Sequence, residues 1–146
     1  MRLRPLTTDP IPADDMPDWV PRHRLLTVQA GVHWDAIRMP VGDALRVHEI
    51  LGPDSGPVLA SAFAGIGVFL LEPPGSTADW SVYRTQLVRP GAHVEIPPAT
   101  VRHGRDMRWL VLPGHGTTDA DALKEALADR STGRGHLRAL RQPATE

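Results

Sequence analysis

Hydrophobic and polar positions in the first half of the chain predict a strand, a helix and a hairpin. Apolar side chains alternate over residues 25–39, as in a strand, and Gly31 within this run indicates a bulge or a break into two strands. From Pro40 the apolar positions follow helical spacing up to Gly52. Residues 57–63 and 66–72 predict a hairpin around Ala64-Gly65, in which the apolar run at 68–71 is expected to form a central strand.

The second half predicts short strands and a final helix. Strands are expected at 85–89 and 93–96, joined by the turn dipeptide Pro90-Gly91, and at 107–112. The last helix is predicted over 119–129, with Thr118 as its cap and Asp121 completing a capping box. Because strands cluster instead of alternating with helices, we expect an α+β fold: a mostly antiparallel sheet of about five to six strands with two helices on one face.

Length and composition are those of one globular domain. The chain has 146 residues, of which 41% are apolar and 23% charged. We expect a Pro-rich arm over residues 1–22, a single α+β domain over 23–130 and a flexible tail over 131–146. No leader-like or membrane-spanning apolar segment is found, so a cytoplasmic location without membrane contact is expected. The net charge of −1 gives no overall attraction to nucleic acid.

The motifs of common enzymes are missing from the sequence. There is no cysteine, which excludes disulfides, thiolate metal sites and a cysteine nucleophile. The seven histidines form no HxH or HExxH motif, and no serine lies in a G-x-S-x-G elbow. Gly65 and Gly67 are too few for a dinucleotide-binding loop. We therefore predict no catalytic residue, no metal site and no cofactor.

Two features remain as candidate ligand-binding sites. Asp35, beside Trp34, is either a functional carboxylate or metal ligand, or a residue that pairs with Arg38; pairing is favoured because structural ion pairs are the commoner case. The second is a basic loop that holds Arg102, His103, Arg105, Arg108 and Trp109. Its arginines would bind a phosphate or carboxylate, and Trp109 or His93 would stack on a base, unless this is an ordinary solvated loop.

Two short motifs within residues 31–112 resemble a known family. One reads GAHVEIPPA over 91–99, followed by Gly104-Arg105 and Arg108-Trp109; the other reads AGIGVF over 64–69. They resemble the prim-pol domains of bifunctional DNA primase/polymerases, the archaeo-eukaryotic primase type of phage and actinobacterial replication proteins. That family has Gly-Gly-Tyr-apolar-apolar-x-Pro-Pro-Ser, Gly-Arg and aromatic-Trp at the first place, and Gly-Gly-x-His-apolar-aromatic at the second.

The departures from this family concern its chemistry. The family holds divalent metals with an early Asp-x-Asp pair, of which only Asp35 is present because Ile37 occupies the second position. Its nucleotide-contacting His corresponds to Gly67, and its third metal acid falls near Gln86. Two-metal phosphoryl transfer needs several convergent carboxylates. The resemblance therefore implies a scaffold without polymerase activity.

These observations lead to competing hypotheses. The first is a non-catalytic accessory or regulatory protein that acts through contacts with another protein, with Trp19, Trp80 and Trp109 as contact or core residues. The alternative is a nucleotide- or nucleic-acid-binding domain without turnover that uses the 102–109 loop. A hydrolase or transferase using Asp35 with a distant histidine ranks last, because local spacing supplies no second group. No pattern defines an oligomeric state.

Overall fold

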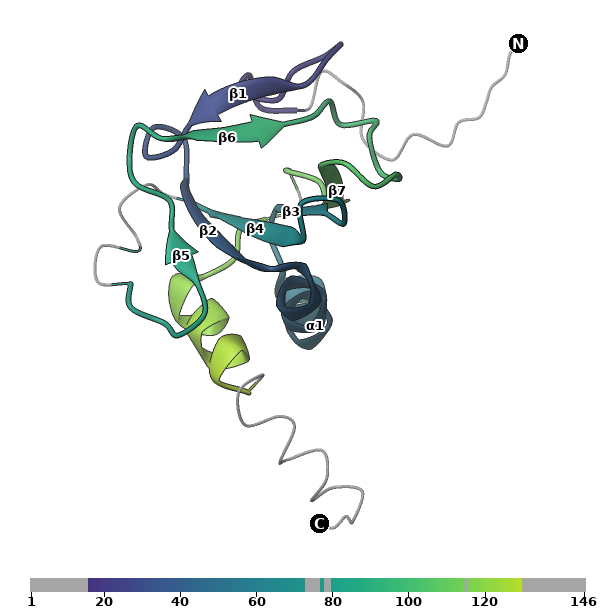
Figure 1. Ribbon diagram of the computed structural model, residues 1–146. Coiled ribbons are helices and arrows are strands. Elements are labelled where there is room, and N and C mark those ends of the chain that lie inside the picture. Colours follow the sequence, from purple (N-terminus) through teal and green to yellow (C-terminus); the bar gives the residue numbers. More distant parts are fainter. Residues whose placement is uncertain (1–15, 73–76, 78–79, 115, 130–146) are drawn as a thin grey trace.

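Strands and helices form three layers in the computed structural model, which describes residues 16–72, 77, 80–114 and 116–129 (Figure 1). A two-stranded sheet covers one face of a five-stranded sheet, and two helices cover the other. This arrangement confirms the predicted α+β fold, including the two helices on one face. Residues 1–15 of the predicted arm and the whole predicted tail lie outside the described residues.

The five-stranded sheet is antiparallel throughout, in the order β5-β2-β4-β3-β7. Its strands are β2 (Asp35–Pro40), β3 (Val58–Ser61), β4 (Ile66–Leu71), β5 (Gln86–Leu87) and β7 (Arg108–Val111). Helix α1 (Val41–Leu51) connects β2 to β3, and a short 3₁₀ helix (Gly52–Asp54) follows it. Strand β4 lies between β2 and β3, which makes a split β-α-β unit and confirms β4 as the central strand.

The two-stranded sheet is made of β1 (Leu26–Gln29) and β6 (His93–Ile96). Gly31, at a φ of 89°, separates β1 from β2, which confirms the predicted break. The Pro90-Gly91 turn does join β5 to β6, but these strands pair with β2 and β1 and not with each other. The bend between β1 and β2 lies beside the bend between β5 and β6, because the Ala30 N–H donates to the carbonyl of Ala92 at 2.8 Å. The pair β1–β6 and the pair β2–β5 are therefore two parts of one bent two-stranded ribbon. The first part forms the small sheet, and the second part belongs to the five-stranded sheet.

Strands β2 and β4 are buried on both faces. Ala36 and Leu70 belong to the core between the two sheets, whereas Ile37 and Phe69 belong to the core between the large sheet and the helices. The close contact of α1 with β4 depends on Gly67, because a Cβ there would collide with the Cβ of Ala44. The sheet is therefore closely covered on both sides.

The second helix, at 120–129, begins with a different cap from the predicted one. The Asp119 carboxylate accepts a hydrogen bond from the Ala122 N–H at 3.1 Å, so Asp119 is the cap. The prediction of Thr118 as cap is wrong, because its buried hydroxyl oxygen accepts the Gly56 N–H at 2.5 Å. This bond ties the start of the helix to the start of β3. Leu123, Ala126 and Leu127 form its buried face.

Candidate functional site

Asp35, the first residue of β2, is hydrogen-bonded to Thr77. Asp35 is 6% exposed, and its carboxylate accepts hydrogen bonds from the N–H of Thr77 at 3.2 Å and from the Thr77 hydroxyl at 2.6 Å. A buried carboxylate is costly unless such donors surround it. Asp35 therefore fastens Thr77, which follows β4 in the chain, to the start of β2.

The strand geometry separates Asp35 from Arg38. The two residues lie three positions apart on β2, so their side chains leave opposite faces of the sheet. Asp35 shares its face with Ile37, toward the helices, whereas Arg38 shares the other face with Ala36. This arrangement contradicts the predicted ion pair. The Nε of Arg38 is buried and has no hydrogen-bond partner among the described residues.

The positions that the resemblance aligns with metal and nucleotide ligands do not converge. Gln86 lies directly opposite Arg38 across β2 and β5 and so shares the face of Arg38, away from Asp35. Gly67 lies against α1. Within the described ranges, no group of three or more His, Asp or Glu side chains is placed to hold a metal ion.

Two arginines of the basic loop are engaged with the edge strand β7. Arg102 donates through Nε to the Trp109 carbonyl at 3.2 Å and through Nη2 to the Leu110 carbonyl at 3.4 Å. Arg108 donates through Nη1 to the Arg102 carbonyl at 3.5 Å. Because both side chains are half-buried in these contacts, they hold the loop in place. His103 and Arg105 are the exposed basic residues of this loop.

The backbone of an exposed aromatic residue that the sequence reasoning missed is hydrogen-bonded to this loop. The Phe63 N–H donates to the Arg105 carbonyl at 2.8 Å, and the Ser61 hydroxyl donates to the same oxygen at 3.4 Å. The side chain of Phe63 is 78% exposed. An aromatic residue next to the Ala64-Gly65 turn was the signal in the sequence. Phe63, His103 and Arg105 together form what we call the Phe63 patch.

Trp109 does not belong to this patch. Its side chain is fully buried between the two sheets, and its Nε1 donates to the Pro97 carbonyl at 2.9 Å. The predicted stacking role of Trp109 is therefore wrong. His93 is exposed on β6, in the other sheet. Trp19 and Trp80 are half-buried. The predicted ligand-binding residues are thus distributed over β2, β6, β7 and the loop before β7.

Comparison of the chain with protein-family models, with curated proteins and with solved structures gave no match. Among the described residues, no helix has the length and apolar character to cross a membrane.

Proposed function

We propose that the chain is a non-catalytic accessory or regulatory domain that binds another protein, on a scaffold similar to a prim-pol domain. The observation that carries this proposal is the outer edge of β1. In the described part of the chain β1 pairs only with β6, so one side of its backbone has no strand partner. Unpaired strand edges are templates for strand addition by a partner.

The side chains around this edge favour a partner strand. Leu25, Leu26 and Val32 are 41%, 43% and 60% exposed, although Leu26 lies opposite the buried Ile96. Exposed apolar side chains beside a free edge gain burial when a further strand is added. The proposed edge site therefore comprises β1 with Leu25 and Val32.

Charge indicates the chemistry of the partner segment. Arg22 and Arg24 lie just before Leu25 in the chain, and both are exposed. Cations beside a binding edge attract an acidic segment and increase its rate of association. The occupant that we propose is thus an extended, acidic segment of a partner protein with apolar side chains at alternate positions. The proposal places this activity in the cytoplasm and assigns it no cofactor.

A labelled peptide of alternating Val and Glu tests this proposal. We expect fluorescence anisotropy to rise with chain concentration, and Leu26→Lys to weaken binding because a lysine at the edge opposes strand addition. The matched control is Leu45→Lys on α1, where the replaced side chain is similarly exposed, at 40%. Equal weakening by both variants, or no binding at millimolar chain, would contradict the proposal.

The Phe63 patch supports a second candidate function, which is binding of a nucleotide or nucleic acid without turnover. Its exposed ring could stack on a base while Arg105 and His103 contact a phosphate. Arg105→Gln should then weaken binding of a short oligonucleotide and reduce its salt dependence, whereas Arg46→Gln on α1 should not. Binding that is unchanged by Arg105→Gln and Phe63→Ala would remove this candidate.

A further inference from the structure

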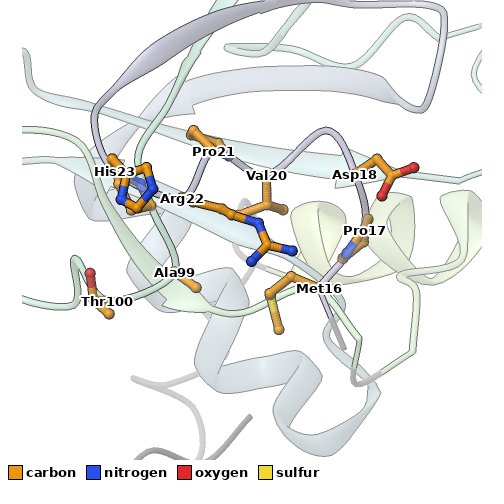
Figure 2. A pocket seen from close by; sticks show the side chains of 10 residues that line it. Met16, Pro17, Asp18, Val20, Pro21, Arg22, His23, Ala99 and Thr100 are labelled. Carbon is orange, nitrogen blue, oxygen red and sulfur yellow. The ribbon is translucent and has the colours of Figure 1, made fainter. Parts of the chain in front are cut away.

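A pocket of about 440 Å³ lies between the segment before β1 and the loop after β6 (Figure 2). Residues 16–18 and 20–23 form one wall, and residues 98–100 form the other. Its volume falls in the range of about 300–1,000 Å³ that is typical of small-molecule sites. None of the residues singled out from the sequence as ligand-binding candidates lines it.

The wall before β1 is anchored to the domain. Val20 is 6% exposed and belongs to the core between the two sheets, and its N–H donates to the Pro17 carbonyl at 3.1 Å. The ring of Trp19 packs edge-on against Trp34, with 5.7 Å between the ring centroids, and in a tilted arrangement against Trp109, with 6.3 Å between the centroids. Val20 and Trp19 therefore hold this segment against the domain, so that this wall of the pocket is formed before a ligand binds.

Hydrogen bonds fix the opposite wall. The Val101 N–H donates to the Pro98 carbonyl at 3.0 Å, which closes a turn around Ala99 and Thr100. The Trp109 N–H donates to the Val101 carbonyl at 2.9 Å and joins this turn to β7. A ligand would thus enter a site whose two walls are already formed, which lowers the entropic cost of binding.

The lining combines an apolar floor with one strong cation. Most of the lining residues are apolar: Met16, Pro17, Val20, Pro21, Pro98 and Ala99. The Arg22 guanidinium lies between Met16 and Ala99 in Figure 2, with His23 and Thr100 to one side, while the Asp18 carboxylate is turned away from it. No ion pair joins Arg22 to an acid of the described residues.

We propose that this pocket binds an amphipathic anion: a small molecule with one carboxylate or phosphate on an apolar body. The anion would pair with the planar donor fork of Arg22, which suits both groups. The apolar body would lie against Met16, Val20 and Ala99. The pocket shares Arg22 with the charged flank of the β1 edge, but it does not require strand addition at that edge, so this inference does not rest on the proposed function.

Binding of octanoate and octyl phosphate to the full chain tests the proposal, with acetate and octanol as probes that lack the apolar body or the charge. We expect ¹H–¹⁵N chemical-shift changes centred on 16–23 and 98–100 with both octyl anions, and only weak changes with acetate or octanol. Arg22→Gln should weaken octanoate binding by about tenfold or more, because it removes a charge-assisted hydrogen bond. The control Arg24→Gln replaces an exposed arginine that does not line the pocket.

Each outcome of these binding measurements supports or overturns the proposed anion site. Equal binding of octanol and octanoate, or equal affinities of Arg22→Gln and the original chain, would overturn the assignment of an anion. Shifts centred on the Phe63 patch, or no shifts with either octyl anion, would overturn the pocket itself. A stronger response to octyl phosphate than to octanoate would assign the head group as a phosphate. Leu26→Lys should leave octanoate binding unchanged, so that failure of the peptide experiment and failure of this one are distinguishable.

Discussion

Gly67 lies on β4 where α1 crosses the sheet, and its replacement by alanine tests how closely these two elements pack. A Cβ at this position would overlap the Cβ of Ala44 and lie 3.5 Å from the Leu59 carbonyl oxygen. The Ala44 Cα would be 3.7 Å away, so the helix itself has to move. Gly67 does not have a positive φ, and its need for glycine is therefore one of space and not of backbone conformation.

The magnitude follows from two opposing effects. Overpacking by one methyl group costs about 1–3 kcal/mol, whereas removing a glycine from a strand interior gains about 0.5–1 kcal/mol. We therefore expect Gly67→Ala to lower the free energy of unfolding by about 1–2 kcal/mol. At roughly 4 °C per kcal/mol for a domain of this size, Tm should fall by about 4–8 °C.

Urea unfolding followed by tryptophan fluorescence measures this change, because Trp34 and Trp109 are fully buried. The control is Gly42→Ala on α1, where an added Cβ meets no atom within 4 Å and should stabilise the helix by about 0.5–1 kcal/mol. Adding Ala44→Gly to Gly67→Ala should restore the space, with a favourable coupling of about 1 kcal/mol. The reasoning is refuted if Gly67→Ala is as stable as Gly42→Ala.

Three further predictions concern the hydrogen bonds of Asp35, the helix cap at Asp119 and the absence of turnover. Asp35→Asn should lower the free energy of unfolding by about 1–2 kcal/mol, since it removes a buried charged acceptor from both hydrogen bonds of Thr77; thermal unfolding that matches the original chain would contradict this role. Asp119→Ala should cost about 1 kcal/mol of unfolding free energy through loss of the helix cap, measured in urea, and no cost would mean that another residue caps the helix. Primer-extension assays with Mg²⁺ or Mn²⁺ should yield no product, because Asp35 and Gln86 lie on opposite faces of the sheet; template-directed product would refute the non-catalytic assignment.

Local patterns were sufficient for much of the fold. The spacing of apolar residues after Pro40 predicts α1, and the two apolar runs around Ala64-Gly65 predict the β3–β4 hairpin, because these elements depend on neighbours close in sequence. Features that depend on distant residues were missed. Thr118 meets Gly56 across 62 positions, and Pro90-Gly91 joins strands that pair with β1 and β2.

The candidate site was harder to predict for the same reason. Trp109 follows an arginine in a polar stretch, and only the covering sheet of β1 and β6 makes it a core residue. Strand alternation alone, by contrast, places Asp35 and Arg38 on opposite faces, so their separation could have been read from the sequence. Phe63 could not be recognised as a candidate from its sequence neighbours. Its backbone contacts the basic loop only because the chain after Gly104 returns to the hairpin, where the Arg105 carbonyl accepts the Phe63 N–H.

Residue-resolved amide hydrogen exchange on the full chain, with and without the Val/Glu peptide, tests most directly whether β1 is the binding edge. With the peptide at about ten times its Kd, we predict that exchange within β1 (Leu26–Gln29) slows by about tenfold, while exchange within β7, an edge strand of the five-stranded sheet, is unchanged. Protection confined to β7 or the Phe63 patch, or bound peptide with no protection in β1, would contradict the account.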